Sequence, residues 1–278
     1  MTARRLRADP ARRPRAALAA GTLLAGAGLL LGGCGHSPAN TASARGGDRA
    51  TPAQAPGGAA GATEATTFAR LKGVPHDDAP DGATGGLVVH PAKPVPVLDK
   101  PGGRTVATLP ATELGGPTWV PVVQSSGDWR RVLLPSRPNG STGWISGAAD
   151  GLLTAHTPYT VKVDLSRRRL TLLKSGKPAG SWAVAVGAAK TPTPTGRTFM
   201  LATLAPAKKT PSPLVLPLGT HSATLDSFGG GPGTVALHGW PDRSVFGKAV
   251  THGCVRVPQD ALQSLSKVPL GSLVFIDA

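Results

Sequence analysis

Residues 236–257 read Ala-Leu-His-Gly-Trp-Pro-Asp-Arg-Ser-Val-Phe-Gly-Lys-Ala-Val-Thr-His-Gly-Cys-Val-Arg-Val. An apolar strand is expected to end at His238, and Cys254 follows 16 residues later, with His252 two residues before it. Only a thiolate attacks a carbonyl, and a free cysteine has a pKa of about 8.5, so an imidazole must take the proton or hold the anion. The pattern therefore makes Cys254 a candidate nucleophile and leaves both His238 and His252 as candidates for its base.

The residues around Cys254 fit a role in catalysis. Gly253 lacks a side chain, so backbone N–H groups can approach a reacting carbonyl oxygen and form an oxyanion hole. Arg256, two residues after the cysteine, can share a face with it and bind a carboxylate. Trp240 follows His238 by two residues, on a loop expected beside the site.

Two other interpretations apply to the same side chains. A free cysteine is usually a buried, inert, small hydrophobic residue, but a Gly-Cys pair between a histidine and an arginine favours catalysis. His221, together with His238, His252 and Cys254, offers zinc-ligand chemistry, although the spacing matches no ligand pattern of known zinc sites. No metal and no cofactor is therefore expected.

Short strands are expected on both sides of this stretch, from about residue 157 onward. The expected strands are 159–164, 168–174, 181–186, 197–204, 234–238 and 273–277. Proline-rich segments at 191–194 and 205–217 predict loops over a cleft. Residues 258–267 predict the one clear helix, which starts with a proline and has three apolar residues on one face, namely Ala261, Leu262 and Leu265. The prediction is an all-β domain with one short helix over residues 155–278.

A second β-rich block precedes this domain, over residues 85–154. Its apolar runs are 87–89, 95–98, 105–107, 119–123, 129–134 and 142–146, with Gly, Pro, Asn and Asp turn signals between them. The stretches PVLDKPGG (96–103), GDWRRV (127–132) and GWI (143–145) resemble bacterial SH3-like modules of wall-associated proteins. The resemblance implies a small SH3-like barrel. Two roles for this block remain open, namely a spacer domain that binds no ligand and a module that binds the cell wall, since a fold does not fix a function.

The first 34 residues have the pattern of an export signal. A basic start is followed by an apolar run over residues 16–31, which is shorter than the roughly 20 residues that a membrane-spanning helix needs. The run ends in Leu-Gly-Gly-Cys34, which resembles the lipobox of bacterial lipoproteins, where the cysteine carries the lipid. An ordinary signal, or a twin-arginine signal containing Arg12 and Arg13, is the alternative. A lipid on Cys34 would leave Cys254 as the only thiol, so no disulfide is expected.

Composition adds two constraints. Residues 35–84 are mostly Ala, Gly, Pro, Ser and Thr, which predicts a disordered tether, because such a segment buries too little apolar surface to offset its ordering entropy. The 278 residues include 37 Gly and 28 Pro, which excludes a helical bundle or coiled coil. The formal net charge of +15 suits a polyanionic neighbourhood such as a cell wall or an anionic membrane face. No nucleic-acid partner is expected.

One family combines these features. A His-Gly pair, a spacer ending in Gly-Lys-Ala-Val, and a Ser/Thr-x-Gly-Cys-hydrophobic-Arg run resemble the L,D-transpeptidase (YkuD-type) catalytic domain. The resemblance implies a β-sandwich-like fold with a catalytic cysteine under a loop. It also implies attack on a peptidoglycan stem peptide after its third, diaminoacyl residue, with release of D-Ala. The acyl group then passes to the side-chain amine of another stem, which makes a 3→3 cross-link.

The resemblance also assigns roles to single residues. Cys254 matches the nucleophile and His238 matches the acid/base. The rest of the signature is matched by Thr251, His252, Gly253 and Arg256. Gly239 stands where some members have Ser or Thr, so the backbone or another residue must orient the imidazole. Val257 stands where Met or Leu is frequent.

Two alternative functions remain open. An L,D-carboxypeptidase would use the same Cys/His pair and give the acyl group to water, and only the acceptor separates it from a transferase. A non-catalytic wall-binding lipoprotein would use the SH3-like module as its working part. The expected protein is a monomer, exported and lipid-anchored to the outer face of the cytoplasmic membrane, that works in the cell wall.

Overall fold

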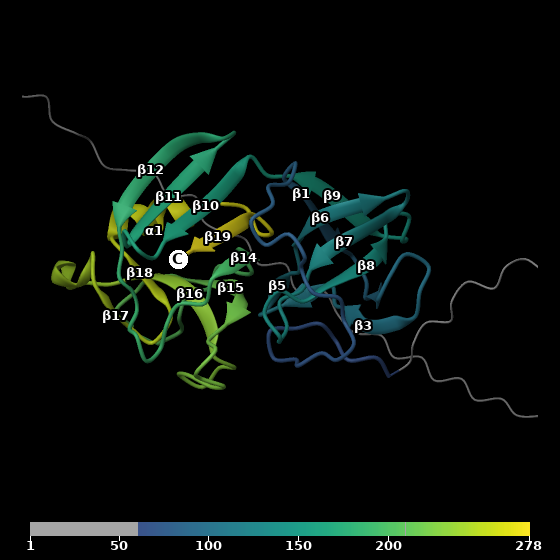
Figure 1. The fold of residues 1–278 in the computed structure, drawn as a ribbon, viewed down its shortest axis with the longest axis horizontal. Coiled ribbons are helices and arrows are strands. Elements are labelled where there is room, and N and C mark those ends of the chain that lie inside the picture. The colour runs from purple at the N-terminus through teal and green to yellow at the C-terminus, as the bar shows by residue number, and fades with distance from the viewer. Residues whose placement is uncertain (1–60, 209) are drawn as a thin grey trace, which may run out of the picture. The chain divides into compact units, whose positions relative to one another are not determined.

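The computed structural model describes residues 61–208 and 210–278. The predicted signal, Cys34 and residues 35–60 of the predicted tether lie outside these residues. Within the described part, most of the regular structure is β-strand, with a single α-helix, as the sequence predicts (Figure 1). None of the described helices is long and apolar enough to cross a membrane.

Residues 61–84 do not form the disordered tether that their composition predicts. Ala65 and Leu71 are buried, and their backbone N–H groups donate to the carbonyls of Thr108 and Arg137 at 2.7 and 2.8 Å. The prediction is wrong here because a few small apolar residues, placed against an existing core, bury enough surface once their backbone groups are also paired.

An ion pair secures the same segment. Asp77 accepts two hydrogen bonds from the guanidinium of Arg197, at 2.6 and 3.0 Å, and both side chains are only 2% exposed. The same guanidinium donates to the carbonyl of Gly82 at 2.5 Å. Segment 61–84 is therefore joined to residue 197, which lies far along the chain.

The first sheet has seven antiparallel strands in the order β3-β2-β8-β7-β6-β1-β9. Its strands are β1 (Leu87–Pro91), β2 (Val95–Leu98), β3 (Thr105–Leu109), β6 (Val120–Ser126), β7 (Trp129–Leu133), β8 (Thr142–Ser146) and β9 (Leu152–His156). A small ribbon is formed by β4 (Thr112–Glu113) and β5 (Gly116–Pro117). No pairing between the end strands β3 and β9 occurs among the described residues, so a closed SH3-like barrel is not shown and stays a prediction.

Two further sheets face each other in the second half of the chain. The larger has the order β12-β11-β10-β19-β14, and the smaller has the order β15-β16-β18. Their strands are β10 (Tyr159–Asp164), β11 (Arg169–Lys174), β12 (Lys177–Ala183), β14 (Gly196–Phe199), β15 (Val215–His221), β16 (Thr234–Gly239), β18 (Val255–Val257) and β19 (Leu273–Asp277). A parallel pair joins β13 (Val186–Gly187) to β17 (Ala249–Thr251). The helices are the 3-10 helix η1 (Arg243–Val245) and α1 (Gln259–Leu265).

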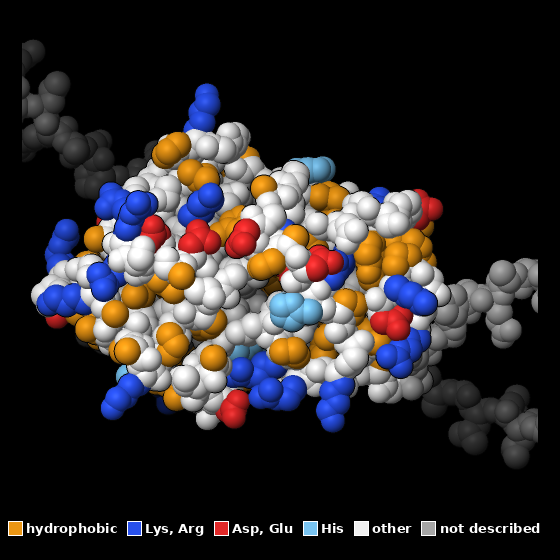
Figure 2. Space-filling view, viewed as in Figure 1, with side chains coloured by type: hydrophobic (Ala, Val, Ile, Leu, Met, Phe, Trp, Pro, Cys, Tyr) orange, Lys and Arg blue, Asp and Glu red, His pale blue; other side chains and the backbone are white. Residues whose placement is uncertain are grey.

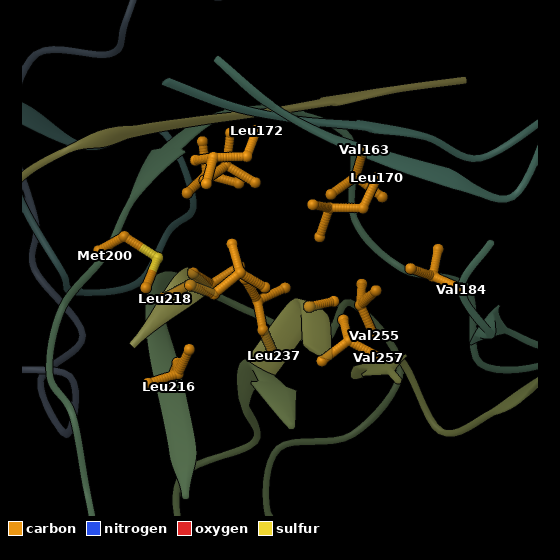
Figure 3. Packing of buried hydrophobic residues seen from close by; sticks show 14 of the residues in the cluster. Val163, Leu170, Leu172, Val184, Met200, Leu216, Leu218, Leu237, Val255 and Val257 are labelled. Atoms are coloured by element: carbon orange, nitrogen blue, oxygen red, sulfur yellow. The ribbon is translucent and has the colours of Figure 1, made fainter. Parts of the chain in front are cut away.

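A hydrophobic core fills the space between these two sheets. Figure 3 shows Leu170 and Leu172 of the larger sheet pointing toward Leu237 of the smaller one. Helix α1 closes the same core with Ala261, Leu262 and Leu265, all buried. Full burial of one such aliphatic side chain stabilises the fold by about 1.5–3 kcal/mol, so this core fixes the position of β16 and β18.

Strand β19 contributes to two cores at once. Val274 and Ile276 pack between the two facing sheets, whereas Leu273 and Phe275 pack with the seven-stranded sheet. Side chains alternate between the two faces of a strand, so a strand with both faces covered is apolar at every position. This explains the unbroken run Leu-Val-Phe-Ile over 273–276.

Two expected elements differ in their limits. The segment 205–217, expected to be a loop, already joins strand β15 at Val215, and Pro217 lies inside that strand. A proline is tolerated there because β15 is the edge of its sheet, where an N–H group toward the outside is not needed. Helix α1 covers 259–265 rather than 258–267, since Pro258 is its N-cap.

Candidate active site

The pairing of β16 with β18 places the predicted catalytic residues on one face of the smaller sheet. The strands run parallel, with Leu237 opposite Val255 and His238 opposite Arg256. Leu237 and Val255 are fully buried in the core, so the alternate residues His238 and Arg256 point to the other face. Cys254 directly precedes β18 and lies two residues before Arg256. The register thus brings Cys254, His238 and Arg256 to the same face.

The backbone orients the imidazole of His238. Its Nδ1 lies 3.0 Å from the carbonyl oxygen of Gly239, and because a carbonyl only accepts, Nδ1 must carry the proton. Nε2 then has a free lone pair and can accept a proton. Burial lowers the pKa of His238, with a smaller contribution in the same direction from the charge of Arg256, while the Gly239 hydrogen bond opposes the shift.

A serine that the sequence did not single out supports this arrangement. The N–H of Gly239 donates to Oγ of Ser212 at 2.7 Å, and that hydroxyl donates to the carbonyl of Leu214 at 2.5 Å. A Cβ at position 239 would lie 3.0 Å from Oγ of Ser212 and 3.2 Å from Leu262. The glycine thus allows the close contact that fixes its own carbonyl. No sequence motif marks Ser212, which lies in the proline-rich segment 205–217.

The thiol of Cys254 is half-buried. Burial raises its pKa above the ordinary value, while the N–H of Ala236 and the charge of Arg256 act in the opposite direction. The raised pKa of Cys254 and the lowered pKa of His238 both favour the neutral forms of the thiol and the imidazole. A pair in this state needs His238 to act as a base when the thiol attacks.

The turn before the cysteine is held by threonine side chains. Thr251 Oγ1 accepts from the N–H of Gly253 at 3.1 Å and donates to the carbonyl of Cys254 at 2.6 Å. Gly253 has a φ of +118°, which favours glycine, and its carbonyl accepts from Oγ1 of buried Thr193 at 2.8 Å. In a trans peptide the C=O and N–H point in opposite directions, so the N–H of Cys254 points away from Thr193.

The second candidate histidine has a different environment. His252 is exposed, and its ring lies against Phe228, with ring centroids 5.2 Å apart and an angle of 31° between the planes. Phe228 belongs to the segment between β15 and β16, which sequence reasoning did not connect with the site. His252 therefore flanks Cys254 next to this segment.

Arg256 and Trp240 form a stacked pair beside His238. The guanidinium carbon lies 3.7 Å from the centroid of the Trp240 ring, a cation–π geometry. The same ring meets His238 edge-on, at 6.0 Å between centroids and 70° between planes. The positive charge of Arg256 is thus fixed on the face of the smaller sheet that carries His238.

His221, the fourth residue of the zinc alternative, is part of the folded core and is hydrogen-bonded there. It is fully buried, and its Nε2–H donates to the carbonyl of Thr67 at 2.7 Å. Burial lowers its pKa to about 4. Within 61–208 and 210–278, no three His, Cys, Asp or Glu side chains are grouped as metal ligands would be.

Comparison with known proteins agrees with this geometry. A family model described as the YkuD L,D-transpeptidase catalytic domain matches residues 158–276. The YkuD proteins of Bacillus licheniformis and Bacillus subtilis are each 30% identical to this chain, over 153 and 151 residues. These alignments cover 53% and 52% of this chain, and 86% and 85% of the relatives.

Solved structures of L,D-transpeptidases are more distant. One from Mycobacterium smegmatis is 15% identical, with a TM-score of 0.39, and the match covers 57% of this chain and 82% of that one. The catalytic domain from E. faecium is 20% identical, with a TM-score of 0.35, over 44% of this chain and 99% of that domain.

The matched domain defines the class as an acyltransferase-type enzyme. The chain belongs to the L,D-transpeptidase (YkuD) family, because the Bacillus relatives share 30% identity with it over most of their length.

Proposed function

We propose that this protein is a peptidoglycan L,D-transpeptidase that forms 3→3 cross-links through a thioester on Cys254. The observation that carries the proposal is the shared sheet face on which Cys254 lies with a histidine whose Nε2 is free to accept a proton. The family acts on peptidoglycan stem peptides, which supplies the substrate class.

The first half-reaction makes the acyl-enzyme. Nε2 of His238 takes the thiol proton while Sγ of Cys254 attacks the carbonyl carbon of the third, diaminoacyl residue. The N–H of Cys254, turned away from Thr193, is a candidate donor to the oxyanion that forms. When the tetrahedral intermediate collapses, the C–N bond breaks, the imidazolium gives its proton to the leaving amine, and D-Ala departs.

The second half-reaction transfers the acyl group. The side-chain amine of another stem attacks the thioester carbonyl and loses a proton to His238. The C–S bond then breaks, and the imidazolium returns its proton to the sulfur of Cys254. The fixed charge of Arg256 stabilises the thiolate in both half-reactions, since it acts to lower the pKa of the thiol.

The test uses the full chain with a purified disaccharide-tetrapeptide. Mass spectrometry of the protein should show an acyl adduct on Cys254, and the products should include free D-Ala and a 3→3 cross-linked dimer. A Cys254→Ser variant is the control for the adduct. Formation of tripeptide and D-Ala without any dimer would instead support the carboxypeptidase alternative, and the absence of both adduct and D-Ala release would contradict enzymatic function.

The place of action is also proposed. The lipobox-like Leu-Gly-Gly-Cys34 supports a lipid anchor at the outer face of the cytoplasmic membrane, with the enzyme working in the cell wall. The SH3-like resemblance of residues 85–154 supports contact with the wall, and we propose that the protein works there as a monomer.

A further inference from the structure

The segment between β15 and β16 connects the nucleophile to the N-terminal half of the chain. We call residues 222–233 the 222–233 loop. Phe228, half exposed, contacts His252, which is two residues from Cys254. The loop contains four glycines, at 229, 230, 231 and 233. Glycine allows many backbone conformations, so the sequence of the loop does little to fix its shape. Phe228 and Gly231 exchange two backbone hydrogen bonds at 3.0 Å, which close the tip of the loop but do not fix the loop against the rest of the chain.

Arg137, from the segment between β7 and β8, binds the loop to the rest of the chain. Its Nη1 donates to the carbonyl of Ser222 at 3.0 Å, and its Nη2 donates to the carbonyls of Leu225 and Pro232 at 3.1 and 3.0 Å. Both ends of the 222–233 loop are thus bound by one guanidinium. A planar group with five N–H donors can bind three carbonyls at once, which a lysine ammonium does with a less fixed geometry.

Gly233 leaves room for this contact. Its φ is +72°, and a Cβ there would lie 2.3 Å from the carbonyl oxygen of Leu225 and 3.0 Å from Nη2 of Arg137. A side chain at position 233 would therefore displace the guanidinium or the carbonyl that it binds. The absence of a side chain at Gly233 therefore allows Arg137 to bind the loop.

Arg137 is itself fixed by its neighbours. Its N–H donates to the carbonyl of Ala69 at 3.0 Å, and its carbonyl accepts from Leu71 at 2.8 Å. Two residues on, the side chain of Asn139 donates to the carbonyl of His221 at 2.7 Å and accepts from its N–H at 2.8 Å. These two hydrogen bonds therefore hold the end of β15 against the same segment that carries Arg137.

We propose that Arg137 is a positioning residue for the active site. From outside the matched catalytic domain, it fixes the 222–233 loop so that Phe228 holds His252 and the Cys254 turn in the reactive arrangement. This inference rests on the proposed function. It makes the N-terminal β-rich region a part of the catalytic machinery in addition to any role as a spacer.

The test compares Arg137→Lys and Arg137→Ala with the wild type as full-length proteins. The readout is the single-turnover rate constant for acylation of Cys254 by the tetrapeptide stem, followed by mass spectrometry. A shift of about 1 Å at a reacting group costs on the order of 10²-fold in rate, so a loss of about tenfold to 10²-fold is expected in both variants.

The matched control is Arg70→Ala. Arg70 also reaches the 222–233 loop from the N-terminal half, through Asp226 at 3.2 Å, but the two side chains are 62% and 89% exposed. Exposed pairs contribute little, so its rate should stay within about threefold of the wild type. An acylation rate at the wild-type level in Arg137→Lys would overturn the proposal, and so would an equal loss in Arg70→Ala.

A double-variant cycle separates positioning from a general loss of structure. If Arg137 acts through the loop tip, Phe228→Ala should slow acylation, and adding Arg137→Lys to it should cost little more. Independent, multiplying losses in the double variant would overturn the proposal. Because only the lysine variant enters the cycle, the test holds even where Arg137→Ala does not fold.

Failure of the proposed function would be seen separately. If the wild type forms no adduct with the stem peptide, the transpeptidase assignment fails. The Arg137 proposal is then tested by the rate of alkylation of Cys254 by iodoacetamide across a pH series. A changed pH profile in Arg137→Lys, with an unchanged one in Arg70→Ala, supports positioning of the thiol, and identical profiles in all three proteins overturn it.

Discussion

At the scale of single residues, the structure separates the two histidines that the sequence left as alternatives. His238 shares the sheet face of Cys254, with Nε2 free, whereas His252 is exposed against Phe228. We expect His238→Ala to abolish turnover as fully as Cys254→Ala, because members of one catalytic unit are not additive.

The matched variant for this prediction is His252→Ala. Its side chain supports the site from outside, so we expect measurable activity, lowered roughly 10–10²-fold, as for a misplaced reacting group. Single-turnover acylation of the three variants by the stem peptide measures the difference. Near wild-type acylation in His238→Ala, together with none in His252→Ala, would reverse the two roles.

The pH dependence of acylation follows from the shifts of the same groups. Burial lowers the pKa of His238 below the ordinary 6.5, so the imidazole stays neutral, and able to accept a proton, down to below pH 6.5. We expect the acidic limb of the acylation rate profile to lie below pH 6.5. In His238→Gln, the residual rate should instead follow the ionisation of the thiol, whose pKa burial raises above its ordinary value. An acidic limb above pH 7 in the wild type would contradict this prediction.

A buried carboxyl far from the site gives a stability prediction. Glu113 is 4% exposed, and burial, with a smaller contribution from the charge of Glu64, raises its pKa from 4.5 to about 7 against an opposing hydrogen bond from the backbone of Thr67. The folded state then binds more protons than the unfolded state between these values, so the free energy of unfolding falls by about 3 kcal/mol as pH rises through this window.

The variant Glu113→Gln should remove this loss and raise stability at pH 8 relative to the wild type. His221 acts with the opposite sign, since its lowered pKa of about 4 makes stability rise with pH from about 4 to 6.5. The two effects partly cancel in the wild type, so the free energy of unfolding should rise more steeply with pH in Glu113→Gln. Urea unfolding from pH 4 to 8 measures both curves, and parallel curves would contradict the assignment.

At the scale of elements, the buried pair of Asp77 and Arg197 joins segment 61–84 to strand β14. We expect Asp77→Asn to lower the free energy of unfolding by about 3–5 kcal/mol, because it leaves a buried guanidinium without its partner charge. Asp78→Asn is the neighbouring control, since Asp78 itself is 75% exposed, and its buried partner Arg131 keeps other hydrogen-bond acceptors when this charge is removed. Equal midpoints of urea unfolding for both variants would show that burial of the pair does not matter.

The sequence predicts those elements whose pattern is local. Strands β2, β8, β10 and β19 match the apolar runs because alternation or full burial is visible in each of them. The sequence does not predict strand β9, since four of its five residues are exposed and all five are placed by pairing with β1. Segment 61–84 was missed because its order depends on partners such as Arg197, about 120 residues away.

The same distinction applies to the site. Cys254, His238 and the glycine turn form a local signature that a sequence displays. The supporting residues Ser212, Thr193 and Arg137 form hydrogen bonds to backbone groups of distant segments. Because every residue has a backbone carbonyl, such bonds leave no recognisable motif in the sequence. Only the fold reveals these supporting residues.

At the scale of the whole molecule, charge is unevenly divided along the chain. Residues 157–278 contain 14 Lys and Arg against 5 Asp and Glu, whereas residues 61–156 contain 8 of each. In the view of Figure 2, Lys and Arg side chains are spread over the visible face with fewer acidic side chains between them. A net positive catalytic domain raises the local concentration of anionic polymers around it, which supports work in a cell wall.

The proposed lipid anchor gives the prediction at this scale. We expect Cys34→Ala to move the protein from the membrane fraction to the medium, or to leave it unprocessed, because the lipid has no other attachment point in the lipobox-like stretch. Fractionation and intact-mass measurement of both proteins provide the check. Membrane retention with unchanged mass in the variant would contradict lipid attachment at this residue.

The two-sided burial of β19 has a consequence for biosynthesis. Residues 273–276 supply side chains to both cores, yet they follow every other described strand in the chain. Neither core can close while these residues are still inside a ribosome or a translocation channel. The described fold, and with it the proposed active site, therefore forms only after residues 273–276 have emerged.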